Sequence, residues 1–429
     1  MIQTLIEQAD RRATVADAVL NTDETTTLAF TAGRMVAATT ATSHGVNLRV
    51  VSDGRVGIAG TTTEYGAELL DRALESARVG ELAVMTLPRP VPLPEVTTHS
   101  PRASAATVQE LAALGTLIRD RLGPERAELS LRISRSLGSV RVANTLGVDA
   151  SYDVSLVVLR LQALKSRGAR QLTIEGTIAG AELPSLPELE QLVGLVRQRL
   201  AWAEREAEIP AGRQRAGFLP TAMPILLTPV EQALVGKSAL HGGSPLARRR
   251  GARAFSELIT LHDDPLLDGR PGSRPIDDEG VVSRRLPLVL AGEIEGLIYD
   301  LETAGRVGAT PSGHGRRSTF GKPQAAYSNL VLEPGASAWE EILAAIGDGL
   351  LIERLRPSGQ ANRIGGTFAL PAALAWRVEG GEITGPLPEM TVAGNAHDLL
   401  GRVLAVGRDP MWVGSRQTPV VVVDGVSVF

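Results

Sequence analysis

The chain has 429 residues, of which 43% are hydrophobic but only 3% aromatic, so its cores must be built mainly from Leu, Val, Ile and Ala. The formal net charge of −4 gives no overall basic field, which argues against nucleic-acid binding through phosphate neutralisation. The absence of cysteine excludes disulfides, thiolate metal ligands and a cysteine nucleophile.

The N-terminal stretch Met1–Arg12 contains acidic residues and has no long apolar core, so it does not resemble a signal peptide. No run in the sequence approaches the roughly 18–20 apolar residues that a membrane span requires. We therefore expect a cytoplasmic protein that has no membrane partner.

Residues 1–95 are predicted to form an α+β domain with a mostly antiparallel sheet. Helical spacing of apolar residues predicts helices at Ile2–Arg12 and Glu64–Val79. Segments in which apolar and polar residues alternate, bounded by turn residues, predict strands at Val15–Asn21, Thr25–Thr31, Arg34–Thr40, Val46–Val51 and Arg55–Thr61. Thr22-Asp23-Glu24 is one of the predicted turns. The rigid, proline-rich segment Pro88–Pro94 is interpreted as the connector that ends this domain.

Residues 96–210 are predicted to form a second α+β domain. Its predicted helices are Ala106–Leu122 and Leu186–Glu208. Its predicted strands are Ala127–Leu137, Val140–Thr145, Ala150–Leu161 and Arg170–Ile178, the first two separated by Gly138-Ser139. Pro210–Gly217 is interpreted as a linker, and residues 211–429 as a β-rich C-terminal domain. The fold class is therefore α+β.

Within the C-terminal domain, two charged, turn-rich segments flank an apolar stretch. The segments are Asp263–Gly280 and Thr310–Arg317. Between them, Leu286–Leu290 and Leu297–Leu301 are predicted to be strands joined by a tight turn at Ala291-Gly292-Glu293. Loops at the ends of a rigid hairpin are common places for binding residues, so this region is where we expect a site.

The same region resembles the TldD/PmbA family, which comprises two-subunit metallopeptidases also described as modulators of DNA gyrase. The individual matches are short and rich in glycine, but their order and spacing extend over more than a hundred residues. They are Gly272–Gly280, Thr303–Gly308, Pro311–Gly315, Leu332–Gly335, Glu340–Ile352, Ser358–Gln360, Val378–Asn395 and Val406–Asp409. The resemblance implies a β-rich C-terminal domain preceded by an N-terminal region that helps to enclose a cleft.

In the catalytic subunits of this family, a helix carries the motif HExxxH, whose two histidines bind zinc and whose glutamate acts as general base. The matching helix here, Thr228–Leu240, contains no histidine, and Glu231 has no ligand partner one turn away. The family's additional cysteine ligand, expected after Val406–Asp409, is also missing. We therefore assign no catalytic residue and no metal ligand to this chain.

Other constellations give no convincing metal site. No two of the six histidines lie at metal-ligand spacing, although His241 and His262 could approach each other in space. His262-Asp263-Asp264 forms a cluster of ligand-type residues, but an Asp-rich turn is more often a surface cap. The arginines Arg248–Arg250 lack interleaved aromatic residues, so they indicate a solvated loop or a contact with an acidic partner rather than nucleic acid.

Seven residues are candidates for lining a peptide cleft. They come from the loops and motifs named above: Asp278, Glu279, Gly313, His314, Gly315, Gln360 and Asn395. The acidic run Asp277-Asp278-Glu279 could supply a carboxylate pair, but we interpret it as a solvated, capping loop. His314 lies between two glycines, and we expect either that it lines a cleft or that the glycines serve a turn with positive φ.

The resemblance is closest to the PmbA (TldE) branch, which also lacks HExxxH. It implies a heterodimer with a zinc-bearing, TldD-like paralogue, in which this chain forms one wall of a chamber for extended or unfolded peptides. Its strands would hold the peptide backbone by β-augmentation. The alternatives are a non-enzymatic regulator acting through protein contacts and, less well supported, a stand-alone enzyme. We also expect that the isolated chain can form a homodimer.

Overall fold

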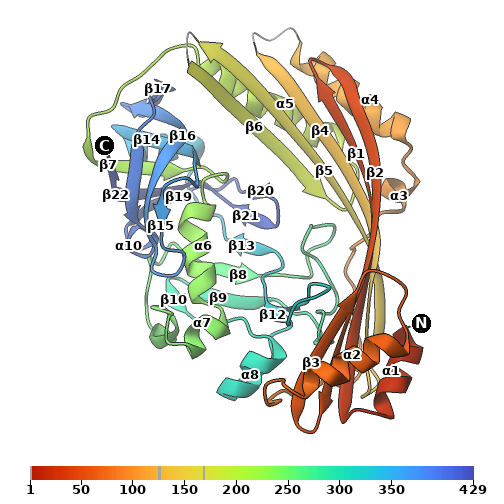
Figure 1. The fold of residues 1–429 in the computed structure, drawn as a ribbon. Helices are drawn as coiled ribbons and strands as arrows, with labels where there is room; N and C mark the ends of the chain where they lie inside the picture. The colour runs from red at the N-terminus through yellow and green to blue at the C-terminus, as the bar shows by residue number, and fades with distance from the viewer. Residues whose placement is uncertain (1, 124–126, 168–169) are drawn as a thin grey trace.

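The structure is a computed structural model that describes residues 2–123, 127–167 and 170–429. It has the expected α+β fold, divided into a long twisted sheet and a β-rich part (Figure 1). The long sheet is formed by residues of the N-terminal half of the chain, and the β-rich part by residues from Gly212 onward.

The strands described in the N-terminal half form one antiparallel sheet, in the order β3-β2-β1-β4-β5-β6. Their bounds are β1 Val15–Thr31, β2 Arg34–Ser52, β3 Arg55–Thr61, β4 Glu128–Asn144, β5 Asp149–Arg167 and β6 Arg170–Gly180. Because β1 pairs with β4, hydrogen bonds connect residues on both sides of position 95/96. The ranges 1–95, 96–210 and 211–429 remain our proposed sequence units, and the first two share this sheet.

The turns predicted inside β1 and β4 are wrong. Thr22, Asp23 and Glu24 continue one strand, and Gly138 and Ser139 continue another. The two sets pair directly, with Thr22 opposite Ser139 and Asp23 opposite Gly138. A Cβ atom on Gly138 would lie 2.1 Å from the carbonyl oxygen of Thr22, so this glycine permits close backbone approach instead of a turn.

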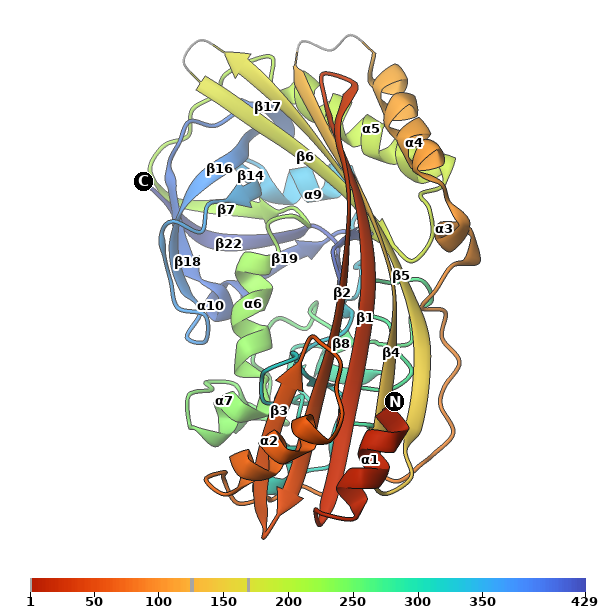
Figure 2. The ribbon, with the colours of Figure 1, turned by 45° about the vertical axis from the view of Figure 1, so that its right-hand side comes forward.

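Helices cover one face of this sheet (Figure 2). Helices α1 (Ile2–Asp10) and α2 (Ala67–Ala77) pack on its lower half, and α4 (Val108–Leu122) and α5 (Leu186–Trp202) on its upper half, with the short α3 (Pro101–Ala105) between. Alternation along β2 directs Val46, Leu48 and Val50 toward the helices. The intervening residues Asn47 and Arg49 therefore face the C-terminal part.

The C-terminal part contains two larger sheets and several short helices. One sheet has the order β10-β9-β8-β13-β21-β20, and the other follows β14-β7-β22-β18-β16 and is closed into a ring by pairing of β16 with β14. The strand bounds are β7 Gly212–Phe218, β8 Leu261–Asp263, β9 Leu286–Leu290, β10 Glu293–Ile294, β11 Gly315–Arg316, β12 Gln324–Ala325, β13 Leu330–Leu332, β14 Gly349–Leu355, β15 Gln360–Ala361, β16 Thr367–Glu379, β17 Glu382–Pro386, β18 Thr391–Asn395, β19 Val403–Val406, β20 Met411–Val413, β21 Arg416–Thr418 and β22 Val421–Val428. The helices are α6 Pro224–Ala233, α7 Gly236–Leu240, α8 Leu301–Val307, α9 Trp339–Ile346 and α10 Ala396–Leu400.

Three predicted elements of this part differ from the structure. The predicted linker Pro210–Gly217 is largely strand β7, whose residues 216–218 are buried in the ring. The predicted helix Thr228–Leu240 is broken into α6 and α7 at residues 234–235. The predicted strand Leu297–Leu301 instead leads into α8, because the side chain of Asp300 accepts the backbone N–H of Thr303 and caps that helix.

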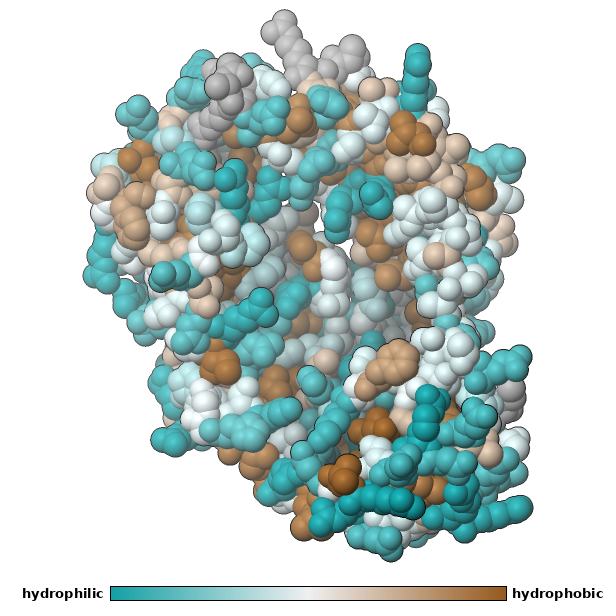
Figure 3. All heavy atoms as spheres, viewed as in Figure 1, coloured by the Kyte–Doolittle hydropathy of each residue, from teal (hydrophilic) through white to brown (hydrophobic). Residues whose placement is uncertain are grey.

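None of the described helices is both long and apolar enough to cross a membrane. The two parts meet at their lower ends and at the top, and a space-filling view shows a hollow between them (Figure 3). At the lower end the loop after β11 lies against β2 and β3. A Cβ atom on Gly60 would lie 1.8 Å from the carbonyl oxygen of Thr319.

We expect Gly60→Ala to lower the free energy of unfolding by about 1–3 kcal/mol, because the added methyl group would push the backbone of the C-terminal loop off the sheet. Urea denaturation monitored by circular dichroism measures this change. Gly243→Ala is the matched control, since a Cβ atom there would meet only the carbonyl oxygen of Ser238 at 3.6 Å, an ordinary contact, and it should change stability by less than about 0.5 kcal/mol. Equal effects of the two substitutions would contradict the close approach.

Candidate functional site

The acidic run Asp277-Asp278-Glu279 is buried at the junction of the two parts. The three residues are 1%, 3% and 1% exposed. Our interpretation of this run as a solvated loop is therefore wrong. The reason is tertiary, because the loop that carries the three acids lies beneath the N-terminal sheet, whose inner face supplies Arg49 as the cationic partner of Glu279.

Glu279 belongs to a buried network that joins the two parts. Its Oε1 accepts a hydrogen bond of 2.6 Å from Arg49 on β2, and Arg49 also makes a two-point contact of 2.8 and 2.9 Å with Asp17 on β1. Arg317, from the loop after β11, donates to Asp17 (2.6 Å) and to the side-chain oxygen of Asn47 (2.9 Å). Charges this deeply buried require partners of opposite sign, and here each has at least one.

The same network holds the loop after His314 in place. The side-chain amide of Asn47 donates to three backbone carbonyls of this loop, those of Ser318, Thr319 and Gly321, each at 3.0 Å. Asp278 accepts the backbone N–H of Arg317 (2.9 Å) and a hydrogen bond from the guanidinium group of Arg316 (3.2 Å). The loop is therefore held by side chains from both parts.

Asp277 accepts only backbone hydrogen bonds. They come from the N–H groups of Glu279 (2.9 Å), Val281 (2.8 Å) and Gly315 (2.8 Å). Burial, together with the nearby negative charge of Glu279, raises the pKa of Asp277 to about 7. Burial also raises the pKa of Glu279, although the positive charge of Arg49 acts in the opposite direction.

His314 is enclosed rather than presented to a cleft. Its imidazole is 0% exposed, with Nε2 3.0 Å from Oδ2 of Asp263 on β8 and Nδ1 2.9 Å from the hydroxyl of Ser312. Serine, histidine and aspartate form a row as in a hydrolase, but the two ring nitrogens are exchanged relative to a catalytic triad. The serine hydroxyl also contacts both backbone polar groups of Tyr299, and Ser312 is 2% exposed. The cluster therefore ties β8 to the loop before β11, and no substrate atom can reach it.

The remaining candidates lie in two places. Gly313 has a φ of 78°, and a Cβ atom on Gly315 would lie 2.5 Å from a carboxylate oxygen of Glu279, so both glycines belong to the buried junction. Asn395 caps α10 and donates to the carbonyl of Gly365, whereas Gln360 is exposed on β15. Both flank strand β16, so the structure brings each group together but keeps the two groups apart.

The helix that matches the zinc-binding helix of the family carries an ion pair. Glu231 on α6 is 5% exposed, and its two carboxylate oxygens accept hydrogen bonds of 2.7 and 2.6 Å from Arg416 on β21. This pair joins α6 to the segment after Val406–Asp409, the two segments to which the resemblance assigns zinc ligands. Zinc does not fit these residues, because α6 supplies no histidine and the carboxylate already has a cationic partner.

Among the described residues, no group of three or more His, Cys, Asp or Glu side chains is arranged so that it could hold a metal ion. In the cluster His262-Asp263-Asp264, Nδ1 of His262 lies 3.1 Å from the guanidinium group of Arg285, and Asp263 is engaged by His314. Burial and the charge of Arg285 lower the pKa of His262. His262 and Asp263 therefore form part of the protein's internal contacts.

Sequence reasoning missed the residues that the N-terminal sheet contributes to the junction. Asp17 is the only polar residue of Val15–Leu20, and Arg49 is the only charged residue of Val46–Val51. A charged residue on a predicted buried strand is the signal that could have identified them, since such residues need buried partners. Arg416, the partner of Glu231, gave no comparable signal because it lies in a polar stretch of sequence.

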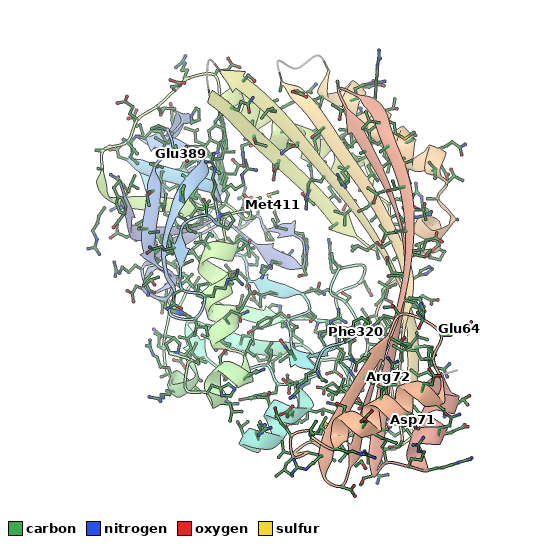
Figure 4. All side chains as sticks on the ribbon, in the orientation of Figure 1. Glu64, Asp71, Arg72, Phe320, Glu389 and Met411 are labelled. Atoms are coloured by element: carbon green, nitrogen blue, oxygen red, sulfur yellow. The ribbon has the colours of Figure 1, made fainter. Side chains whose placement is uncertain are left out.

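The hollow between the two parts is bordered by side chains of both. At its upper end a cavity of about 280 Å³ lies between β6 and the ring, lined by Gln171, Thr173, Arg354, Leu355, Arg356, Pro357 and Ala373. Here Arg354 on β14 forms an ion pair of 2.9 Å with Glu175 on β6, which connects the ring to the long sheet. Met411, on the edge strand β20, and Phe320, in the loop after β11, lie between the two parts and are 41% and 69% exposed (Figure 4).

Replacing Arg49 tests the contribution of the buried network to stability. We expect Arg49→Met to lower the free energy of unfolding by about 3–5 kcal/mol, because Glu279 loses its cation while it remains buried. Arg12→Met is the control, since the pair between Arg12 and Asp71 is 48% and 59% exposed and should contribute less than about 1 kcal/mol. Guanidinium denaturation of both variants measures the difference, and a small loss in Arg49→Met would refute a stabilising role of the network.

The raised pKa of Asp277 predicts a pH-dependent stability difference. Between pH 3.8 and about 7 the folded chain retains a proton on Asp277 that the unfolded chain releases, so this group's contribution to stability falls as pH rises through that window. The stability of the wild-type chain relative to Asp277→Asn should therefore decrease by roughly 2 kcal/mol between pH 5 and pH 8.

Asp149→Asn provides the control for this pH series. The hydrogen bond from Arg141 lowers the pKa of Asp149 below its ordinary value, so Asp149 is ionised in the folded and unfolded chain throughout this range. Its relative stability should not change between pH 5 and pH 8. A flat profile for Asp277→Asn, measured by urea denaturation at each pH, would show that the carboxyl group is ionised in the folded chain as well.

Comparison with known proteins connects this geometry to a family. Residues 211–429 match the model of the PmbA/TldA metallopeptidase C-terminal domain, and residues 16–79 match domain 1 of the same family. A metalloprotease of Methanothermobacter thermautotrophicus is 26% identical over 428 residues, which cover 95% of this chain and 89% of that protein. A metalloprotease of Methanocaldococcus jannaschii is 33% identical over 170 residues, but this chain spans only 38% of its length.

Two crystal structures have the same fold. TldE from Thermococcus kodakarensis superposes with a TM-score of 0.89 at 22% identity, covering 100% of this chain and 99% of that one. A protein of Thermotoga maritima named as a modulator of a DNA gyrase gives the same TM-score, identity and coverage. The match over 211–429 includes the buried acidic run, His314, and the pair of Glu231 with Arg416. This chain belongs to the PmbA/TldD family.

Proposed function

We propose that this chain is a non-catalytic, TldE-like subunit of a heterodimeric zinc metallopeptidase, working in the cytoplasm. In this proposal a TldD-like paralogue with an HExxxH helix supplies the zinc and the general base, and this chain supplies one wall of the chamber in which peptides are cleaved. The observation that carries the proposal is the ion pair between Glu231 and Arg416, which occupies the two segments where a catalytic subunit would hold zinc.

The chemistry of this pair supports a structural role for Glu231. A general base must accept a proton from a water molecule near neutral pH, and the base therefore needs a free oxygen directed at that water. Both carboxylate oxygens of Glu231 accept hydrogen bonds from the guanidinium group of Arg416, and these hydrogen bonds raise the pKa of Arg416. Arg416 thus remains a cation at neutral pH, and each oxygen of Glu231 is held by it instead of being free to be directed at a water molecule.

The shape of the chain supports peptide binding. The face of the long sheet opposite the helices carries polar, half-buried side chains such as Thr25 and Thr27, and it borders the hollow seen in Figure 3. Strand β20 is the edge of its sheet and lies beside β6. An extended peptide could pair with such an edge through its backbone, which would make recognition largely independent of peptide sequence.

A second candidate function is regulation through protein contacts without any part in catalysis. The similar structure from Thermotoga maritima is named as a modulator of a DNA gyrase, and this name favours the second candidate. The net charge of −4 favours contact with protein over contact with DNA. Identifying the proteins that co-purify with this chain at native expression level distinguishes a metallopeptidase paralogue from another target.

The subunit proposal predicts how zinc and activity are divided between two chains. We expect the isolated chain to retain no stoichiometric zinc in elemental analysis and to hydrolyse no unfolded peptide. The complex with a paralogue that carries HExxxH should contain zinc and cleave the peptide. Tight zinc binding together with hydrolysis by the isolated chain would overturn the proposal.

A matched pair of substitutions in the complex separates structural from catalytic glutamates. Glu231→Gln in this chain should leave peptide hydrolysis within about tenfold of the wild-type complex, because the residue only holds α6 against β21. Replacing the glutamate of the paralogue's HExxxH by Gln should reduce the rate by about 10²–10⁴-fold, as expected for loss of a general base. A comparable loss from both substitutions would show that Glu231 takes part in the reaction.

A further inference from the structure

Two arginines face each other on the inner face of the long sheet, which is the face opposite the helices. Arg132 on β4 and Arg160 on β5 are direct partners in the antiparallel register. The residues on either side of each arginine are buried in the core beneath helices α4 and α5, and they are Leu131, Ile133, Leu159 and Leu161. Because side chains alternate between the two faces of a strand, both arginines project from the other face, on the side of the C-terminal part (Figure 1).

This pairing is unfavourable on its own. The Cβ atoms of direct cross-strand partners lie about 4.5–5.5 Å apart, and two like charges at this spacing destabilise a sheet. Both arginines are exposed, and within the described residues neither guanidinium group has an ion pair or a hydrogen bond with another protein group. Glu175, the acid on the neighbouring strand β6, is engaged elsewhere, because its carboxylate lies 2.9 Å from Arg354 and accepts a hydrogen bond of 3.0 Å from Gln162. The two positive charges therefore have no counterion in the described part of the chain.

The surface around the two arginines is uncharged. Ala29 on β1 lies beside Arg132, and Thr177 on β6 lies beside Arg160, so the row extends over four strands. The inner-face residues that follow along β4 and β5 are uncharged as well: Ser130, Ser134, Val158 and Gln162. Because none of these described neighbours is an acid, the guanidinium groups present their N–H donors to the hollow that Figure 3 shows.

We propose that Arg132 and Arg160 together bind the carboxylate group of a peptide that lies in the hollow. Each guanidinium group presents a planar fork of N–H donors that matches the two oxygens of a carboxylate. An anion between the two cations also offsets their mutual repulsion. The inference rests on the proposed function, which places peptides in the hollow, and it adds a preference for acidic peptides. The carboxylate is either the C-terminus of the peptide or the side chain of an aspartate or glutamate.

Binding of three matched peptides to the full-length chain tests this preference. The peptides share one uncharged sequence and a fluorescent label at the N-terminus. The first has an amidated C-terminus, the second a free C-terminal carboxylate, and the third an amidated C-terminus with one central glutamate. At low salt, at least one of the two acidic peptides should bind about fivefold more tightly than the neutral peptide, as measured by fluorescence anisotropy. The second and third peptides distinguish the two sources of the carboxylate.

Replacing both arginines should abolish the preference. In Arg132→Gln combined with Arg160→Gln, the three peptides should bind with equal affinity. Arg72→Gln is the matched control, because Arg72 is an exposed arginine on α2, on the opposite face of the sheet (Figure 4), and it should leave the preference unchanged. Sodium chloride at about 0.5 M should weaken the preference of the wild-type chain, since salt screens exposed charges.

A stability measurement separates binding from a structural role. Because Arg132→Gln and Arg160→Gln each remove the like-charge pair, both should shift the midpoint of urea denaturation upward. A lower midpoint would mean that the arginines stabilise the sheet, and it would overturn the proposal. Equal affinity of the wild-type chain for the three peptides, no binding of any of them, or a preference that persists in the double variant would overturn it as well. Failure of the proposed function would appear separately, as the absence of peptide hydrolysis by the complex with the HExxxH paralogue.

Discussion

The buried ion network around Arg49 is the interaction on which the arrangement of the whole chain depends. Asp17 and Arg49 come from the long sheet, whereas Glu279 and Arg317 come from loops of the C-terminal part. Because each charge is desolvated, the sheet and the loops stabilise each other only when the geometry is correct, and without the sheet Glu279 and Arg317 would lose Arg49 and Asp17, their partners of opposite charge in this network. Such a contact specifies one relative placement of the two parts. Hydrophobic packing alone would specify that placement less strictly, because it is not directional.

This rigid joint explains how the chain can keep a hollow open. The two parts are held together at the lower end by the network and at the upper end by Arg354, and they diverge between these contacts (Figure 3). A hollow bordered by half-buried polar side chains would collapse or fill if the two parts could move freely. The polar junction therefore fixes segments that are distant in the sequence relative to each other. In smaller proteins a metal ion or a disulfide has this role.

The ion pair of Glu231 with Arg416 shows the same principle in the C-terminal part. It joins helix α6 to strand β21, and a two-point contact between a guanidinium and a carboxylate provides direction as well as attraction. A contact of this kind holds a helix and a distant strand together through charge alone, without a metal ion.

The sequence by itself determined the family, the α+β class and the missing ligands, since these depend on which residue types are present and in what order. It also predicted locally specified elements such as strand β3 and the helix α4, whose capping box is formed by neighbouring residues. Only the tertiary structure decided that Thr22–Glu24 continue a strand, that Asp277–Glu279 are buried and that His314 is enclosed by Asp263. The partners of β1 and of Glu279 lie more than a hundred positions away in the sequence, and the partner of His314 lies about fifty positions away. A local sequence pattern contains no information about contacts over such distances.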